Sequence, residues 1–427
     1  MSSAQSHMGI NRAALVVILL LAAAIRLGWG LSRPVSDDAL SALPDQVEYL
    51  TLGRNVLHAV GMSFVDPRFG DRVYAFRMPG YPLFVAACGG NVRVVRIAQA
   101  ILDVLTVLAV FLLARLLMPG PSRRAPLLAA LIVALNPLLV YFSALVLSET
   151  LFVAMLMWGM VLLVVGIGSS DRRGRVLVWL PGAILLSLSV LVRPSAGLLP
   201  VVLGIGAMFV NHRARAAYES TPPVNALGRW PLPIGATMLL LVGLALLPWA
   251  LRNYRIFHRL VWTDSNSGFT LYDGYNPDAT GASDQRFVRN VPQLRLMDEL
   301  GRSQYLTIQA TAYLRAHPRR VADLALVKAA RTWSPMPLSD SFGSDRNRAI
   351  LLLYSIPFDL LVLAGLWLGD VRRSVKAFVL LPAIYFTLIH ALTVGSLRYR
   401  LPAEPALAIL AACLLYRPMS GGERVDN

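Results

Sequence analysis

Two carboxylates and an arginine stand out in the polar stretch 43–84, the first long polar segment of a mostly apolar chain. Asp45 and Glu48 open a helical pattern, and Arg77 precedes the return to apolar sequence. A carboxylate can take a proton from a reacting hydroxyl or amine, and an arginine can neutralise charge on a leaving group. This stretch is therefore our candidate for chemistry. Considered alone, Asp45 and Glu48 are better explained as a capping box at a helix start.

The return segment runs Arg77-Met78-Pro79-Gly80-Tyr81-Pro82, and its two prolines restrict the backbone. Tyr81 is expected at the depth of the lipid head groups, as in the aromatic belts of membrane proteins. That interpretation accounts for the tyrosine, but it does not account for the spacing of arginine, proline and glycine. Arg77 and Tyr81 are therefore both candidates for binding a substrate.

Four further charged residues lie at the ends of apolar runs: Glu149, Arg193, Arg398 and Arg400. A carboxylate at a membrane edge is costly to insert and is a functional candidate by default. Helix capping is the alternative for Glu149, and arginines that snorkel to the interface are the alternative for the other three. We favour binding of an anionic substrate, because these arginines lie at ends predicted to face outward, where positive charge is disfavoured.

The sequence offers no ligand set for a metal or a nucleotide cofactor. Its two cysteines, Cys88 and Cys413, are far apart in sequence and lie in apolar context, which argues against a disulfide scaffold or a metal cluster. The chain also lacks a glycine-rich phosphate loop, zinc-ligand spacing and a serine–histidine motif. We predict neither a metal nor a cofactor.

Composition predicts an all-α polytopic membrane protein. The 427 residues are 56% hydrophobic and 15% charged, whereas a soluble globular protein averages about 25% charged residues. The net charge of +16 is almost entirely arginine, since lysine occurs only at Lys328 and Lys376. No basic tract is interleaved with aromatic residues, so anionic lipid head groups are a better partner than nucleic acid.

Apolar runs of bilayer length, about 20 residues each, predict ten membrane spans. A cleaved signal peptide is the alternative for the first run, but the many later runs favour an uncleaved span. The predicted spans are 13–31, 97–118, 124–145, 147–168, 176–193, 195–211, 233–251, 349–369, 375–394 and 401–416.

Basic residues in the short loops predict the orientation, because cytoplasmic loops carry the excess of arginine and lysine. Alternate loops hold Arg123 and Arg124, then Arg172, Arg173 and Arg175, then Arg213, Arg215 and Arg229, and finally Arg372, Arg373 and Lys376. Both termini are therefore expected in the cytoplasm. Residues 32–80 and 252–348 are expected on the outer face of the cytoplasmic membrane.

Three regions follow from this topology. Residues 1–251 form an N-terminal transmembrane region that includes the first outward loop, 252–348 form an outward subdomain, and 349–427 form a C-terminal transmembrane region. Within the subdomain, turn-forming residues fill 266–281, whereas 296–316 and 321–333 have helical spacing of apolar residues. The last of these is a basic, tryptophan-ended amphipathic helix, which is typical of a membrane surface.

Several motifs recur together in one known family. They are the acid and tyrosine of Asp45–Tyr49, the segment Arg77–Phe84, Asn136-Pro137, Ser148–Phe152, Arg193-Pro194, Leu271–Gly281 and Arg398–Pro402. With these motifs in this order, the chain resembles the GT-C superfamily of integral-membrane glycosyltransferases. It is similar to the bacterial branch that contains protein O-mannosyltransferases and the aminoarabinose transferases of lipid A.

The resemblance implies a sugar donor carried on a polyprenyl phosphate, an active site on the outer face and inversion at the anomeric carbon. It also implies that Asp45 is the general base and that no metal is needed. The family often has a second acid directly after this aspartate. Here Gln46 stands in that position, and Glu48 is the nearest substitute.

Under the resemblance, the donor phosphate is expected to contact Arg77, Arg193, Arg398 and Arg400. The acceptor is open among a protein, a lipid and a polysaccharide. Two rival functions remain: a polysaccharide polymerase or ligase that uses a lipid-pyrophosphate donor, and a non-enzymatic transporter of lipid-linked sugars. A transporter is expected to carry charges at mid-membrane and broken helices in matching halves, whereas here the charges cluster at the outer edge.

Overall fold

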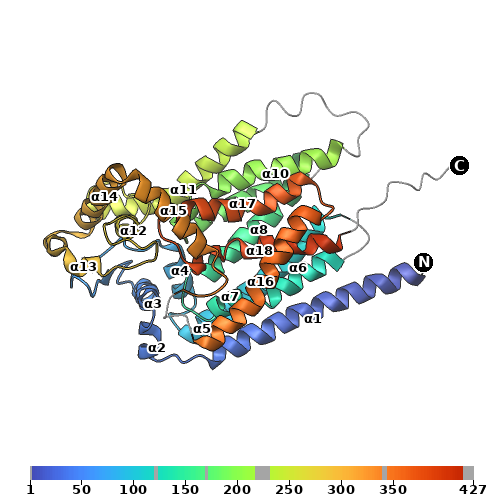
Figure 1. The fold of residues 1–427 in the computed structure, drawn as a ribbon, viewed down its shortest axis with the longest axis horizontal. Helices are drawn as coiled ribbons and strands as arrows, with labels where there is room; N and C mark the ends of the chain where they lie inside the picture. The colour runs from blue at the N-terminus through green and yellow to red at the C-terminus, as the bar shows by residue number, and fades with distance from the viewer. Residues whose placement is uncertain (1, 120–123, 169–171, 217–230, 339–343, 417–427) are drawn as a thin grey trace.

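The computed structural model describes residues 2–119, 124–168, 172–216, 231–338 and 344–416. Arg123 and Arg229, two of the loop arginines used to predict orientation, lie outside these ranges. Long helices run side by side through most of the molecule, and short helices and loops gather at one end, on the left in Figure 1. The first helix begins at the opposite end, on the right in Figure 1, so the two ends of the molecule are built from different elements.

The bundle is built from long apolar helices, as the sequence predicts. Its members are α1 (Ser2–Ser32), α5 (Val92–Leu117), α6 (Arg124–Ala134), α7 (Pro137–Ser143), α8 (Glu149–Gly168), α9 (Arg172–Ser189), α10 (Leu199–Ala216), α11 (Pro231–Phe257), α16 (Asp345–Leu368), α17 (Arg373–Ala391) and α18 (Glu404–Ala412). Short 3-10 helices η1 (Pro194–Ala196), η4 (Leu397–Arg400) and η5 (Cys413–Leu415) adjoin them.

Among the described residues, six helices are long and apolar enough to cross a membrane, and the bent pair α6–α7 would make a seventh span. Three shorter apolar helices cover 177–189, 194–210 and 404–415. Each of the ten predicted spans coincides with one of these helices or with the bent pair. The chain is thus a helical, multi-pass membrane protein, and the count of ten stays a prediction.

The predicted span 124–145 is bent by 51° between α6 and α7. Pro137 causes the break, because its ring cannot continue the hydrogen-bond ladder of α6 but fits the first turn of a new helix. Asn136 caps α7 by accepting hydrogen bonds from the backbone amides of Leu138 and Leu139, at 2.9 and 3.1 Å. The bend directs α7 toward the end of the molecule where the loops gather.

A buried ion pair fixes the bend. Arg26 of α1 bonds Asp103 of α5 at 2.6 Å and donates to the carbonyls of Val133 and Ala134 at the end of α6. The guanidinium therefore gives the Ala134 carbonyl a partner where the helix breaks, and it adds to the hydrogen bond that the Val133 carbonyl accepts from the amide of Asn136. Both side chains are buried, so this pair serves architecture.

The end of the molecule where the loops gather contains short elements from two distant parts of the chain. From the first loop come α2 (Asp37–Ser41), α3 (Pro44–Leu57), the antiparallel pair β1 (Phe64–Val65) and β2 (Arg72–Val73), and α4 (Gly80–Ala87). From the second come α12 (Ser267–Gly274), α13 (Phe287–Asn290), η2 (Pro292–Leu296), α14 (Glu299–Ala316) and α15 (Pro318–Thr332). The helices predicted at 45 onward, 296–316 and 321–333 are confirmed.

The interpretation of 266–281 as turns is wrong for the first half of the segment, where α12 lies, whereas 275–281 consists of turns and bends. Gly268, counted as a turn former, instead allows close packing: a Cβ there would lie 2.1 Å from the carbonyl oxygen of Ser303 in α14. The glycine-rich composition therefore reflects helix contact.

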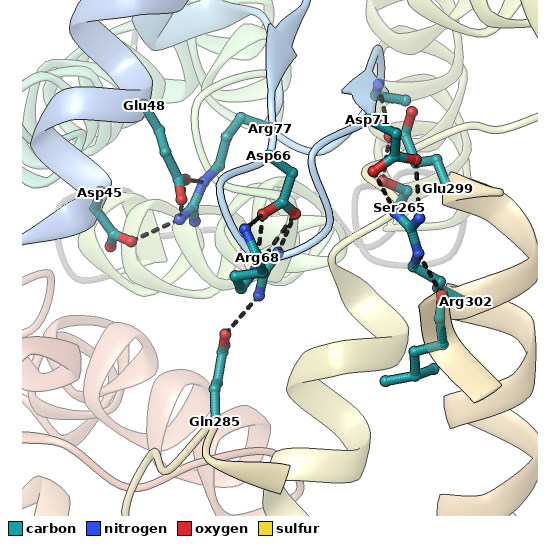
Figure 2. A network of polar contacts seen from close by, with 12 residues as sticks. Asp45, Glu48, Asp66, Arg68, Asp71, Arg77, Ser265, Gln285, Glu299 and Arg302 are labelled. Carbon is teal, nitrogen blue, oxygen red and sulfur yellow. Dashed lines mark hydrogen bonds and ion pairs between the residues drawn. The ribbon is translucent and has the colours of Figure 1, made fainter. Parts of the chain in front are cut away.

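The two loops are tied together by charged side chains (Figure 2). Glu299 of α14 accepts hydrogen bonds from the backbone amides of Tyr74 and Ala75, at 2.6 and 2.8 Å. Arg302 pairs with Asp71 at 2.9 Å, and the first loop returns a contact from Arg68 to the side-chain oxygen of Gln285 at 2.8 Å. These contacts form one polar layer over the end of the bundle.

Candidate functional site

A cavity of about 880 Å³ lies between the bundle and the loop layer. Part of its lining is apolar and comes from α1, α7 and α16, including Ile25, Trp29, Leu138, Val140, Ile350 and Leu351. The lining also carries the charged residues Asp45, Glu48, Arg68, Arg77, Asp273, Arg331 and Arg398. The space therefore suits a molecule with an apolar part and an anionic or polar part.

Asp45 is not a helix cap, contrary to the simpler interpretation of the sequence. Leu43 is the N-cap of α3, Pro44 occupies the first turn, and no side chain caps the helix. Instead, Asp45 Oδ1 pairs with Arg77 Nη2 at 2.6 Å, and its Oδ2 pairs with Arg398 Nη1 at 2.8 Å. Each carboxylate oxygen thus holds one guanidinium, and the two arginines come from opposite ends of the chain.

Glu48 provides the second carboxylate that contacts Arg77 (Figure 2). One helical turn from Asp45, its Oε2 accepts a hydrogen bond from Arg77 Nε at 2.7 Å. The guanidinium also lies over the rings of Tyr49 and Phe76, at 5.4 and 5.3 Å from their centres. Arg77 is therefore held in one orientation, with α3 supplying both of its acids.

The spacing of arginine, proline and glycine in the return segment has a packing cause. Gly80 donates from its backbone amide to the carbonyl of Leu191 at 2.9 Å. A Cβ on Gly80 would lie 2.8 Å from the carbonyl carbon of Leu191, so a larger residue would push the segment away. This close contact fixes the return segment against the residues that follow α9, and it thereby fixes the position of Arg77.

Arg398 links Asp45 to a second, deeper acid. Its Nε donates to Glu149 Oε1, and the same oxygen pairs with Arg193 Nη1 at 3.2 Å. Glu149 has an exposed side-chain fraction of 1%, and its Oε2 has no hydrogen-bond partner among the described residues. Six predicted site residues therefore form one chain of ion pairs, from Glu48 through Arg77, Asp45, Arg398 and Glu149 to Arg193.

Of the eight predicted residues, Tyr81 and Arg400 lie outside this chain. Tyr81 is fully buried and donates to Gln99 Oε1 at 2.5 Å, so its interpretation as a head-group anchor is wrong. Arg400 is buried beside Glu404 and Asp359, and neither Tyr81 nor Arg400 lines the cavity.

Gln46, which replaces the second acid of the resembled family, points away from the cavity. Its side chain is buried, donates to the carbonyl of Leu40 at 3.3 Å and accepts from the amide of Val146 at 3.0 Å. The amide group uses both a donor and an acceptor, which a carboxylate does not offer. Gln46 therefore fixes α3 against the segment between α7 and α8.

The ion pairs set the protonation of the two acids on α3. Burial alone would raise the pKa of Asp45, but the charges of Arg77 and Arg398 together hold it well below its usual range. Burial raises the pKa of Glu48, with Arg77 offsetting part of the effect and the neighbouring Asp45 adding to it. Asp45 is therefore the more acidic of the two.

Two residues that sequence reasoning did not single out also face the cavity. Arg331 ends α15, and Asp273 ends α12. The helical spacing of Leu324, Lys328 and Arg331 could have pointed to the first of them. Among the described residues, no group of three histidine, cysteine or acidic side chains is placed to hold a metal ion.

Comparison with known proteins identifies relatives for part of the chain. Residues 81–249 match the family of dolichyl-phosphate-mannose-protein mannosyltransferases. An enzyme of Pseudomonas aeruginosa, undecaprenyl phosphate-alpha-4-amino-4-deoxy-L-arabinose arabinosyl transferase, is 29% identical over 223 residues, which are 51% of this chain and 37% of that protein. The Pseudomonas paraeruginosa protein of the same description gives the same identity and coverage. This chain thus spans about 37% of the length of these curated relatives.

The fold is shared with archaeal oligosaccharyltransferase structures from Archaeoglobus fulgidus. The AglB complex with an inhibitory peptide and a dolichol-phosphate has a TM-score of 0.56 at 14% identity, covering 95% of this chain and 50% of that chain. The apo form gives 0.54 at 15% identity, covering 94% and 50%. At this level of identity the likeness concerns the fold.

Proposed function

We propose that this chain is a member of the GT-C superfamily of integral-membrane glycosyltransferases, and that it moves a sugar from a polyprenyl-phosphate-linked donor to an acceptor, with inversion at the anomeric carbon. One observation carries the proposal. Asp45 is paired with both Arg77 and Arg398 in the lining of a cavity that apolar side chains of α1, α7 and α16 also line. A general base, cations for a leaving phosphate and a surface for a lipid chain are thereby combined in one space.

The apolar part of the lining supports a lipid-linked donor. Side chains of α1, α7 and α16 form it, and the bend at Pro137 places α7 against the cavity. Burial of a prenyl chain on such a surface is favourable by about 25 cal/mol per Å² of apolar area. The phosphate at the end of the chain would then reach the charged residues of the lining.

In the proposed reaction, Asp45 accepts the proton of an acceptor hydroxyl or amine. The oxygen or nitrogen bonds to the anomeric carbon while the bond from that carbon to the phosphate oxygen breaks. Attack from the face opposite to the phosphate inverts the configuration. The electron pair of the broken bond stays on the phosphate, and Arg77 and Arg398 stabilise its charge in a cavity with little water.

A carboxylate that holds two guanidinium groups is a weak base, because both cations favour its ionised form. Donor phosphate that draws hydrogen bonds from Arg77 and Arg398 would weaken their hold on Asp45. Its basicity would then rise only when the donor is present. This coupling makes proton transfer depend on donor binding.

The other predicted residues support this centre. Glu48 orients Arg77. Glu149 orients Arg398 and is itself paired with Arg193. Tyr81 packs edge-on against Tyr49, with ring centres 4.9 Å apart, and supports α3. Arg400 holds α16 and α18 together, so among the arginines predicted from sequence only Arg77 and Arg398 are assigned to donor contact.

We place the site on the outer face of the cytoplasmic membrane, with both termini inside. The asymmetry of basic residues in the short loops supports this orientation. The joining of residues 32–80 and 252–338 into one layer, away from the start of α1, agrees with it. The three-part division at 251 and 348 remains part of the proposal.

Donor chemistry tests the function. Purified protein in lipid vesicles is supplied with an acceptor extract and a panel of sugars, each linked to undecaprenol by one phosphate or by a pyrophosphate. We expect a glycosylated product with a monophosphate donor, detected by mass spectrometry. Product from pyrophosphate donors alone would identify a polymerase or ligase. Movement of the donor across the vesicle without covalent product would identify a transporter.

A further inference from the structure

Arg331 differs from the other cations on the cavity wall. Arg77, Arg398 and Arg68 each pair with at least one carboxylate. Arg331 has no ion pair among the described residues, and its Nε is buried without a hydrogen-bond partner. The residue as a whole is only partly buried, but a charged N–H group that is out of water without a partner is costly. Such a group is explained when its partner is a ligand.

Asp273 lines the same cavity, but it is already engaged. Its carboxylate accepts hydrogen bonds from Ser283 Oγ and the amide of Asp284, at 2.6 and 2.7 Å. Lys328, one turn before Arg331, adds a second positive charge and lies 3.5 Å from the centre of the Tyr275 ring. Burial lowers the pKa of Lys328 to about 8, so it is protonated at neutral pH.

The formal charges of the ion-pair network cancel. Three carboxylates, Asp45, Glu48 and Glu149, face three guanidinium groups, Arg77, Arg193 and Arg398, so their sum is zero. A donor phosphate brought to this neutral network would carry an unbalanced negative charge. Arg331 is the cavity residue that would balance it without breaking an ion pair.

The backbone around Arg331 is shaped for close approach. Gly281 has a φ of +83°, and a Cβ there would meet Arg331 Cδ at 3.6 Å and Val327 at 3.0 Å. Gly395 donates its amide to the carbonyl of Gly281 at 2.9 Å. The segments around these glycines are thereby held against the last turns of α15, beside the guanidinium.

Arg331 lies near both parts of a lipid-linked phosphate. Pro337 and Leu338, a few residues later, line the cavity and lead toward its α16 wall. In the other direction, Gly395 is three residues from Arg398, so their Cα atoms are at most about 10 Å apart. Arg331 thus lines the same cavity as these apolar residues and Arg398.

We propose that Arg331 binds the phosphate of the lipid-linked donor through charge-assisted hydrogen bonds, as an oxyanion site separate from the Asp45 network. The planar guanidinium can offer two parallel N–H groups to phosphate oxygens. This inference rests on the proposed function, since it assigns the anchor of the same donor. Arg331 would hold the phosphate, and Arg77 and Arg398 would stabilise its charge as the sugar leaves.

Binding of undecaprenyl phosphate to the full-length protein in detergent tests the proposal. Affinity is compared among wild type, Arg331→Gln, Arg331→Lys and the control Arg319→Gln, which removes an exposed arginine from the same helix. We expect Arg331→Gln to weaken binding by about tenfold to a hundredfold. Arg331→Lys should recover part of the loss, and Arg319→Gln should match wild type. Undecaprenol, which lacks the phosphate, should bind all four proteins alike.

The outcomes separate the two proposals. Wild type that does not prefer undecaprenyl phosphate to undecaprenol would overturn the proposed function. Wild type with that preference and an unchanged Arg331→Gln would overturn only the assignment of Arg331. Unchanged donor binding with a raised acceptor KM would likewise overturn it, since the site would then serve the acceptor. If Arg331→Gln fails to fold, equal affinity of wild type and Arg331→Lys, which differ in hydrogen-bond geometry, would contradict the guanidinium contact.

Discussion

Two arginine–carboxylate networks stand at helix ends in this protein, and they do different work. In the Asp45 network, the side chains of Asp45 and Arg398 are 28% and 21% exposed to the cavity. In the second network, Arg400 and Glu404 are 1% and 2% exposed. The residue types are the same in both. Access to the cavity therefore distinguishes an ion pair that can meet a substrate from one that holds helices together.

The Arg400 network connects α16, the start of α18 and the bend between α6 and α7. Arg400 pairs with Asp359 of α16 at 2.9 Å and with Glu404 at the start of α18. Glu404 Oε2 also accepts from Asn136 Nδ2 at 2.8 Å, which attaches the α6–α7 bend. Its effect on the site is indirect, because α7 and α16 supply apolar residues of the cavity lining.

The largest expected effect separates stability from chemistry. Arg400→Gln would leave Glu404 buried without its cation, at a cost of about 3–5 kcal/mol of unfolding free energy. The folded fraction should keep its transfer rate within a few-fold. Denaturation in detergent and the rate per folded molecule measure the two quantities. The double variant Arg400→Met, Glu404→Leu should lose less stability, and a selective loss of transfer with normal stability would reverse our assignment.

The converse effect is expected at Arg398. Arg398→Gln should reduce kcat/KM about a hundredfold to a thousandfold, since it removes a preorganised donor near the leaving phosphate. Stability should change little, because Glu149 keeps its contact with Arg193. Parallel measurements of transfer and thermal midpoint check both parts, with Arg398→Lys as the charge-preserving control. Transfer within a few-fold of wild type would remove Arg398 from the chemistry.

A smaller effect tests Gln46, beside the base yet turned away from it. Gln46→Glu restores the acid usual in the resembled family, but it removes the donor to Leu40 and brings a carboxylate toward that carbonyl. Unfolding free energy should fall by about 1–3 kcal/mol. Transfer per folded molecule should not increase. A rise in transfer without loss of stability would show that an acid at this position reaches the substrate.

The smallest effect concerns pH and Lys328. Its pKa in the folded protein is lowered to about 8, so the unfolded chain binds more protons between about pH 8 and 10.4. The stability that Lys328 contributes therefore increases with pH across this window and is lost as pH falls through 8. The thermal midpoint of wild type should rise relative to that of Lys328→Met between pH 7.5 and 10. A constant difference between the two proteins would contradict the lowered pKa.

Local patterns predicted much of the architecture. Apolar runs gave the bundle helices, and spacing of three and four residues gave α14 and α15, because both depend on which side chains face the core. Partners across the chain were beyond these patterns. Arg398 and Arg400 have the same charge two residues apart, yet η4 directs one to Glu149 and the other to Glu404.

The misread residues share a physical cause. Tyr81 and Gln46 look like surface residues in sequence, and only the packing of α3 and α4 against the bundle shows them buried. Arg331 draws attention because its Nε is buried without a hydrogen-bond partner among the described residues, which is a property of the folded chain alone. Pro137 is the exception, because a proline within a predicted span is a local signal from which the bend could have been predicted.

The most direct test of the account is the transfer rate of Asp45→Asn, which keeps the size of the side chain and removes the base. We expect transfer from a polyprenyl-phosphate donor to fall by about a hundredfold to ten-thousandfold, with normal membrane insertion and retained binding of undecaprenyl phosphate. Transfer at the wild-type rate by the folded variant would contradict the account, because another group would then have to take the proton.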